Sequence, residues 1–211
     1  MILKYHKECD PTHCITLNVS AGDVYEEYVK RYGEDAVFPV VKTPIGIFAV
    51  TVCCDNNFPE IWRCMAMKGA EVIFHPTGEG YAPHHSPPND PWEHAKRTRA
   101  YENIAYVVDC NGGLSRGRSE IINFDGGIIA VADGPGEVIL HGRVDIDALR
   151  YRRTRPGWNP IYEKTFLIGL RAKLYAKEYE KFPGWPLNYF ADKPIKSIAQ
   201  LKELEKEIVK N

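Results

Sequence analysis

The sequence predicts an α/β domain with a mixed sheet, and two patterns carry that prediction. Residues 49–79, AVTVCCDNNFPEIWRCMAMKGAEVIFHPTGE, place one short helix between two apolar runs, as in parallel strands joined by a helix. Residues 119–132, SEIINFDGGIIAVA, instead place Asp125-Gly126-Gly127 between two short apolar runs, which indicates an antiparallel hairpin. Strand–helix–strand units followed by a hairpin are typical of a mixed sheet in an α/β or layered α+β domain.

The first part of the chain contains one helix and one buried strand. Residues 24–35, VYEEYVKRYGED, predict a short helix that ends at Gly33. A turn follows at Thr43-Pro44. The apolar run 45–52 is rich in β-branched and aromatic residues, so we expect a buried strand there.

The segment after this strand predicts a helix with clear ends. Pro59 suits the first turn of a helix, and Glu60 suits its positive N-terminal end. Gly69 suits the stop. Residues 71–75, EVIFH, then predict the next buried strand.

The following segments alternate again before the pattern changes. Residues 92–103, WEHAKRTRAYEN, predict a helix, and residues 104–110, IAYVVDC, a buried strand. After the hairpin, residues 136–145, GEVILHGRVD, predict one more strand. Residues 145–154, DIDALRYRRT, predict a short helix.

Composition excludes several classes of partner. The chain has 211 residues, of which 44% are hydrophobic and 26% charged, and a net charge of -1, as in an ordinary globular protein. Nucleic acid and anionic membranes both attract a basic surface, so we expect neither as a partner. The N-terminus, MILKYHKECD, lacks the apolar core of a signal peptide, and no apolar run is long enough to span a bilayer. We therefore expect a cytoplasmic protein.

The six cysteines predict reduced thiols rather than disulfides, because the chain can build a substantial core without them. Four residues near the N-terminus form a Cys/His-rich patch, namely His6, Cys9, His13 and Cys14. Their spacing matches no zinc-finger pattern, so we expect no metal site.

Cys53 and Cys54 lie where a predicted strand stops and a helix is about to begin. Ligands of α/β sheets bind beyond the carboxyl ends of strands. A thiol close to a helix N-terminus has a lowered pKa, and backbone N–H groups at such a turn stabilise an oxyanion. The residues alone leave two interpretations open, a nucleophile or a pair of small buried hydrophobic side chains.

A long ordered pattern surrounds these cysteines and continues to residue 153. After the strand come Cys53-Cys54-Asp55, Phe58-Pro59-Glu60, Arg63 and Gly69-Ala70-Glu71. The segments RTRAYENIAYVVDCN, GRSEIINFDGGIIA and VDIDALRYRR follow in order. This pattern resembles the carbon–nitrogen hydrolase (nitrilase) family, and it covers residues 4–153. The resemblance implies a nitrilase-like α-β-β-α sandwich with mixed sheets, truncated at its N-terminus.

The resemblance also implies a domain organisation. Residues 1–154 are expected to form a partial carbon–nitrogen hydrolase domain. Residues 155–211 are expected to form a helical tail that packs on this domain or on a partner subunit, with helical patterns over 162–182 and 197–211. Its apolar stripe favours a homo-oligomer, a dimer or larger; the stripe consists of Phe166, Leu170 and Leu174.

By the same resemblance, Cys53 is the nucleophile and Cys54 supplies a backbone N–H to the oxyanion hole. The family's lysine follows a Tyr-x-Lys pattern, which places it at Lys7, with Lys4 as the alternative. The cation would stabilise the tetrahedral oxyanion. Three further residues are expected to border the substrate, namely Asp55, His75 and Glu79, although a structural role is the alternative for His75.

The family's general-base Glu comes from a segment before the lysine, and no Glu precedes Lys7 in this sequence. Without such a carboxylate, nothing takes the proton from Cys53 or activates water. Three explanations stay open. The chain is a fragment of a longer hydrolase, a separate chain supplies the Glu, or the protein binds its ligand without turnover.

Substrate class follows from the residues after the nucleophile. Nitrilases in this family tend to have Trp-Glu there, whereas this chain has Cys54-Asp55. The resemblance therefore favours hydrolysis of a linear amide or N-carbamoyl compound through a Cys53 thioester, with nitrile hydrolysis as the alternative. The expected partners are this small molecule and water, and no cofactor is needed.

Overall fold

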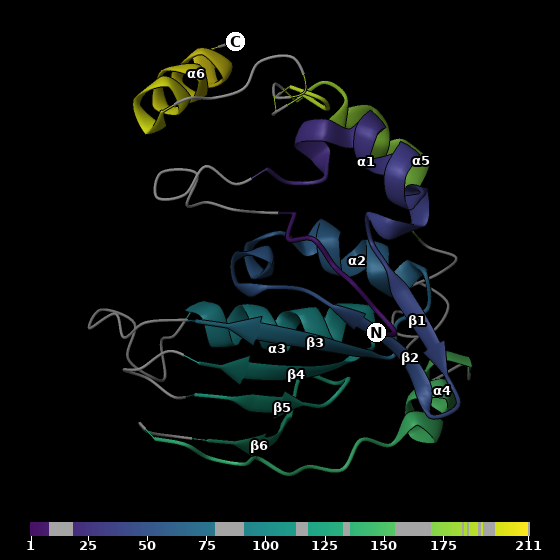
Figure 1. Cartoon of the computed structure of the whole chain (residues 1–211). Helices are drawn as coiled ribbons and strands as arrows, with labels where there is room; N and C mark the ends of the chain where they lie inside the picture. The colour runs from purple at the N-terminus through teal and green to yellow at the C-terminus, as the bar shows by residue number, and fades with distance from the viewer. Residues whose placement is uncertain are drawn as a thin grey trace. The chain divides into compact units, whose positions relative to one another are not determined.

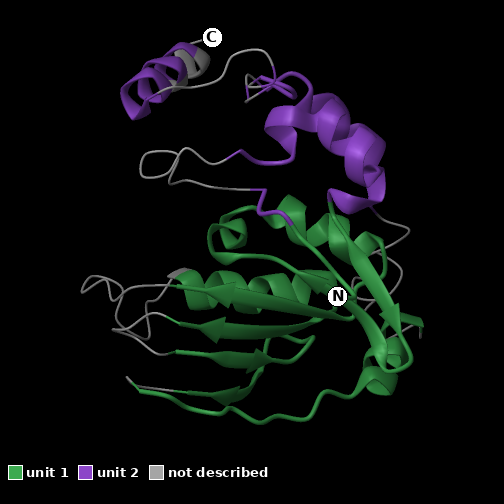
Figure 2. Cartoon of the chain, in the orientation of Figure 1, with its two compact units in different colours: residues 1–5, 38–168 green, residues 6–37, 169–211 purple. Residues whose placement is uncertain are grey.

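The structure is a computed structural model in which two compact units are described (Figure 2). Unit 1 consists of Met1–Tyr5 and Phe38–Ile168, and unit 2 of His6–Val37 and Gly169–Asn211. The residues described are 1–8, 19–78, 91–112, 118–132, 136–154, 170–182, 184, 186–189, 191 and 197–210. The predicted domain boundary between residues 154 and 155 stays a prediction.

Unit 1 contains a six-stranded sheet whose strands lie in chain order, from β1 to β6 (Figure 1). The central strands β2, β3 and β4 are parallel, and the other neighbouring pairs are antiparallel. The predicted mixed sheet is therefore confirmed. The strands are β1 (Val40–Thr43), β2 (Gly46–Val50), β3 (Val72–Thr77), β4 (Tyr106–Asn111), β5 (Glu120–Ile122) and β6 (Ile128–Val131).

Helices connect the parallel strands as the sequence predicts. A 3-10 turn, η4 (Cys53–Asn57), and α2 (Pro59–Met67) join β2 to β3. The helix α2 begins at the predicted proline and stops before Gly69, whose φ of 98° only glycine adopts easily. Helix α3 (Pro91–Asn103) lies between β3 and β4 in the chain, and α4 (Ile146–Thr154) follows β6.

The prediction of a strand over residues 136–145 is wrong, because these residues form no strand in the structure. A Cβ added at Gly142 would lie 2.8 Å from Cδ1 of Ile121 and 3.2 Å from Cγ2 of Ile129. The segment thus lies against side chains on a face of the sheet. From that position the backbone of residues 136–145 cannot form the hydrogen-bonded ladder that would add a strand at the edge of the sheet.

One face of the sheet, which we call the helix-covered face, carries Ile73, His75 and Asp109. The ring of Trp62 of α2 packs against that of His75 in a tilted arrangement, with ring centroids 5.1 Å apart. Lys96 of α3 reaches Asp109 of β4. Helices α2 and α3 therefore lie on this face.

The opposite face, which we call the open face, carries Val72, Phe74 and Tyr106, as the alternation of side chains along β3 and β4 requires. Leu149 of α4 packs with Val72 and Tyr106 in one apolar cluster. Phe74, farther along β3, remains 39% exposed.

Unit 2 is helical, and hydrogen bonds join segments of it that are distant in the sequence. His6 Nδ1 lies 2.6 Å from the hydroxyl of Tyr28, and the backbone N–H of Asn188 donates to the carbonyl of Gly22 at 3.0 Å. Leu174 of the predicted stripe is 58% exposed, and Phe166 lies outside the described residues. The homo-oligomer stays a prediction. The elements are η2 (Gly22–Val24), α1 (Tyr25–Tyr32), η3 (Glu34–Ala36), α5 (Ala172–Tyr179) and α6 (Ile198–Lys210).

Within the described part of the chain, none of the helices has the length and the apolar character needed to cross a bilayer.

Candidate functional site

Cys53 occupies a sharp turn at the end of β2. Val52 is still extended, with φ of -134° and ψ of 117°, whereas Cys53 has a φ of 52°. A residue other than glycine in this left-handed region is strained, and it persists only where its surroundings fix it. The turn redirects the chain from the strand into η4, and it leaves the thiols of Cys53 and Cys54 half-buried.

Asp55 fixes this turn from inside. Its side chain is fully buried, and its Oδ2 accepts hydrogen bonds of 2.8 Å from the N–H of Val52 and from the hydroxyl of Tyr5. Its backbone carbonyl accepts from Nε1 of Trp62 at 3.1 Å. The carboxylate is thus engaged in holding the backbone on both sides of Cys53.

Asn56 ties the same turn to helix α3. The guanidinium of Arg99 donates to the carbonyl of Asn56 at 3.1 Å, and the amide of Asn56 donates to the carbonyl of Trp92 at 3.3 Å. Arg99 also pairs with Glu102 at 3.0 Å. The turn is therefore held between α2 and α3.

A polar row crosses the helix-covered face just below the turn. It consists of Thr51, His75, Asp109 and Glu120. The register pairs His75 with Asp109 and Asp109 with Glu120, and Val50, next to Thr51, pairs with Phe74. All four side chains are buried, with exposures of 0–2%.

Lys96 brings a buried cation to this row from α3. Its side chain is 1% exposed, and its Nζ lies 2.9 Å from Asp109 Oδ2 and 3.7 Å from Glu120 Oε2. Arg118 reaches Oε1 of Glu120 at 2.5 Å. Because removing charges from water is costly, these carboxylates are tolerated inside only with such partners.

His75 is neutral in this environment. Burial, and next the charge of Lys96, lower the pKa of His75 from 6.5 to about 3. Its Nδ1 shares a hydrogen bond of 2.9 Å with Oγ1 of Thr51, and its Nε2 lies 4.0 Å from Oδ1 of Asp109. His75 thus joins the carboxylates of the polar row to Thr51, two positions before Cys53.

The remaining predicted residues do not all lie in unit 1. Lys7 belongs to unit 2 and is half-buried, whereas Lys4 belongs to unit 1 and is exposed. Glu79 lies outside the described residues, as do Cys9, His13 and Cys14 of the Cys/His-rich patch. Within the residues that the structure places, no group of three or more His, Cys, Asp or Glu side chains is arranged to hold a metal.

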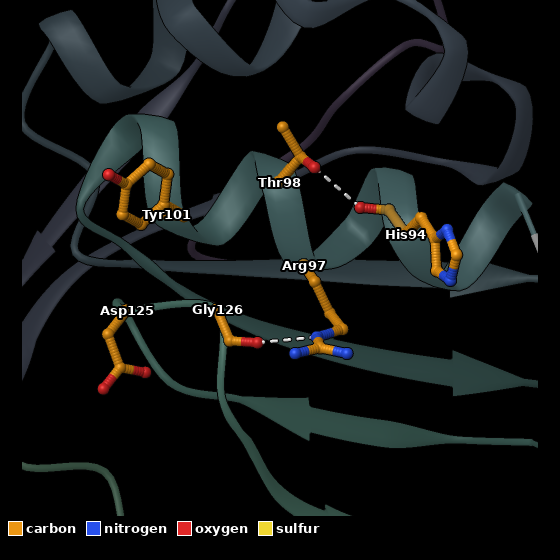
Figure 3. Close-up of a pocket in the computed structure, with 6 residues that line it drawn as sticks. All are labelled: His94, Arg97, Thr98, Tyr101, Asp125 and Gly126. Atoms are coloured by element: carbon orange, nitrogen blue, oxygen red, sulfur yellow. Dashed lines mark hydrogen bonds between the residues drawn. The ribbon is translucent and has the colours of Figure 1, made fainter. Parts of the chain in front are cut away.

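An open cavity of about 340 Å³ lies elsewhere, between α3 and the hairpin turn (Figure 3). Arg97 crosses to this turn and donates from Nε to the carbonyl of Gly126 at 2.8 Å. The side chains that line this cavity do not include those of the Cys53 turn or the polar row, so we assign the cavity no part in the chemistry. The lining residues are His94, Arg97, Thr98, Tyr101, Asp125 and Gly126.

Local sequence signals place the turn, but they do not reveal how the buried charged groups below it are paired. Asp109 is a carboxylate within the apolar run IAYVVDC, which demands a buried partner. That signal was present in the sequence. The identity of the partner, Lys96, was not, because it lies on another element.

Comparisons with known proteins agree with this geometry. The carbon–nitrogen hydrolase family model matches residues 4–154. An N-carbamoylputrescine amidase of Arabidopsis thaliana is 29% identical over 152 residues, which are 64% of this chain and 51% of the relative. A formamidase of a Bradyrhizobium strain is 30% identical over 182 residues, 77% of this chain and 52% of the relative.

The chain thus spans about half the length of the curated relatives it matches. Among solved structures, a carbon–nitrogen hydrolase from Helicobacter pylori G27 matches with a TM-score of 0.55 and 25% identity. That match covers 68% of this chain and 53% of the solved one.

Proposed function

Because the chain belongs to the carbon–nitrogen hydrolase family, we propose that it cleaves the carbon–nitrogen bond of a linear amide or an N-carbamoyl compound through a thioester on Cys53. The observation that carries the proposal is the left-handed backbone of Cys53, with a φ of 52°, at the carboxyl end of β2. Relatives named N-carbamoylputrescine amidase, formamidase and citrullinase support this substrate class.

The proposed reaction is an acyl transfer in two steps. The thiolate of Cys53 attacks the carbonyl carbon, and the backbone N–H of Cys54 stabilises the oxyanion. The family resemblance assigns a second stabilising charge to Lys7. The carbon–nitrogen bond then breaks, and ammonia or an amine leaves with a proton. Water attacks the thioester, releases the acid and restores the thiol.

The turn supplies preorganisation to this reaction. Donors that are already fixed where charge develops cost no reorganisation when the reaction occurs. Asp55 holds the backbone before Cys53 through the N–H of Val52. We therefore assign Asp55 a positioning role, in which it keeps the Cys54 N–H aimed at the oxyanion.

His75 is proposed as a second positioning residue. With a pKa of about 3 it stays neutral at physiological pH, so it is unsuited to donate a proton there. Its hydrogen bond to Thr51 fixes the strand end from which the turn departs.

The mechanism also needs a carboxylate that takes the proton from Cys53 and later activates water. The family resemblance assigns this step to a Glu in a segment before the lysine, and the chain spans about half the length of its curated relatives. In the turn itself, the carboxylate of Asp55 already accepts from the N–H of Val52 and the hydroxyl of Tyr5. This engagement favours a second candidate function, a chain of the same fold that binds the amide without turnover.

Ammonia release tests the choice between these functions. Formamide, an N-carbamoyl amine and a simple nitrile are offered to the chain and to its Cys53→Ala variant. We expect release from the first two compounds and none from the variant. Ammonia release from the nitrile alone would show that nitriles, and not amides or N-carbamoyl compounds, are the substrate class. Amide binding without release, measured as a thermal shift, would establish the binding chain.

Alkylation by iodoacetamide tests the nucleophile without any substrate. Burial raises the pKa of the Cys64 thiol, so Cys64 serves as an internal control of similar exposure. We expect Cys53 to react at least about tenfold faster than Cys64 at neutral pH, because only the thiolate is nucleophilic. Trypsin separates the two thiols into different peptides, which mass spectrometry quantifies. Equal rates would refute an activated Cys53.

A further inference from the structure

Two thiols meet at the proposed nucleophile. The Sγ atoms of Cys53 and Cys54 lie 3.6 Å apart. Neither cysteine is in a disulfide, and both are half-buried, so each thiol keeps some exposure to solvent. The proposed hydrolysis uses the side chain of Cys53 and only the backbone of Cys54, which leaves the second thiol without a role.

We propose that Cys53 and Cys54 form a modification site that a peroxide closes reversibly into a disulfide. Cys53 loses its proton, and its thiolate attacks one oxygen of hydrogen peroxide, which gives a sulfenic acid and releases hydroxide; the hydroxide takes up that proton and leaves as water. The Cys54 thiol then attacks the sulfenic sulfur, the S–S bond forms, and a second water leaves. The two thiols lose two electrons in total, and the peroxide gains them.

Backbone geometry predicts that this disulfide is easily reduced. Adjacent Cα atoms are about 3.8 Å apart, whereas ordinary disulfides join Cα atoms about 4.4–6.8 Å apart. The bond therefore forms under strain, and strained disulfides are the labile ones that thiol reductants reopen. Cys53 already departs from helical and extended backbone, with a φ of 52°.

Closure of the bond goes beyond the hydrolysis, because it needs no substrate. If Cys53 is also the nucleophile, closure stops turnover until the bond is reduced. This consequence rests on the proposed function, whereas bond formation does not, so the two are measured separately.

Mass spectrometry of one tryptic peptide tests bond formation. Residues 43–63, TPIGIFAVTVCCDNNFPEIWR, contain only these two cysteines. After a brief treatment with hydrogen peroxide, we expect this peptide to lose two hydrogens and to resist alkylation, and dithiothreitol to restore both thiols. A dimedone adduct on Cys53 with Cys54 still alkylated, or a bond from either residue to another cysteine, would overturn the proposal.

Two variants serve as controls for the oxidation. Cys54→Ser removes the resolving thiol, so we expect its Cys53 to accumulate as a sulfenic acid that dimedone traps. Cys110→Ser, an exposed thiol on another strand, is expected to leave the disulfide yield unchanged. If Cys54→Ser gave no dimedone adduct, peroxide would not reach Cys53 and the proposal would fail. A disulfide that forms without any ammonia release in the untreated chain would reject only the proposed hydrolysis.

Discussion

On the helix-covered face of the sheet even the charged side chains are buried, whereas on the open face large apolar ones remain in contact with solvent. Asp109 and Cys110 show the contrast within two residues of β4. Asp109 is 2% exposed and pairs with Lys96 at 2.9 Å, whereas Cys110, on the opposite face, is exposed. Phe74, next to the fully buried His75 in β3, is 39% exposed.

The contrast between the two faces shows that the side chains that support the candidate site lie on the helix-covered face of the sheet. A charge stays buried only where a second element brings a counter-charge, and α3 does this through Lys96. The polar row then links to the Cys53 turn through Thr51. On the open face the hydroxyl of Tyr106 bonds the backbone of Asp145, at the start of α4 and away from the Cys53 turn, so changes on this face should leave the turn intact.

Lys96→Met gives the largest expected effect, because it breaks the buried pair on the helix-covered face. Removal of one partner of such a pair costs about 3–5 kcal/mol, since the carboxylate of Asp109 is left buried without its cation. Denaturant unfolding measures the loss. The double variant Lys96→Met with Asp109→Leu should recover part of it.

Lys42→Met, on the exposed side of β1, is the matched control for this change. We expect it to alter the free energy of unfolding by less than about 0.5 kcal/mol. A cost below about 1 kcal/mol for Lys96→Met would show that the polar row does not depend on its cation.

Lowering the pH gives the second largest expected effect on stability, because it protonates His75. Its pKa falls from 6.5 in the unfolded chain to about 3 in the folded one, so the unfolded state binds the proton first. The contribution of His75 to stability is therefore complete above its unfolded pKa and is lost as the pH falls toward its folded pKa. Between pH 7 and pH 5 we expect a loss of about 2 kcal/mol from this residue.

His75→Asn tests the assignment, because an Asn amide reaches the position of Nδ1 and keeps a partner for Thr51 but does not titrate. Stability curves of the chain and of this variant at both pH values measure the difference. If both lose the same free energy on acidification, another group is responsible for the pH dependence.

Cys110→Ser gives the smallest expected effect on stability and serves as the test of the open face. The thiol is exposed, so the free energy of unfolding should change by less than about 0.5 kcal/mol. The iodoacetamide rate of Cys53 should not change, because the change lies away from the polar row. A slower Cys53 in this variant would mean that the two faces are coupled.

Much of the fold of unit 1 is predictable from local signals. Pro59 and Gly69 mark the ends of α2, and Asp125-Gly126-Gly127 marks the hairpin. The strand expected over residues 136–145 is the exception. Its apolar residues satisfy a strand pattern, but Gly142 lies against Ile121 on a face of the sheet, where no ladder is available. A pattern of side chains does not specify which backbone will be its neighbour.

The candidate site also has features that local sequence patterns predict and features that depend on contacts between distant elements. Local sequence patterns suffice for the order of the elements and the position of the Cys53 turn, because hydrophobic periodicity and turn residues act over a few neighbouring positions. The three-dimensional fold is needed to see that Thr51, His75 and Asp109 form one buried row and that Lys96 provides its counter-charge. The physical reason is that burial of a charge depends on a partner, and here that partner comes from a different element of the chain.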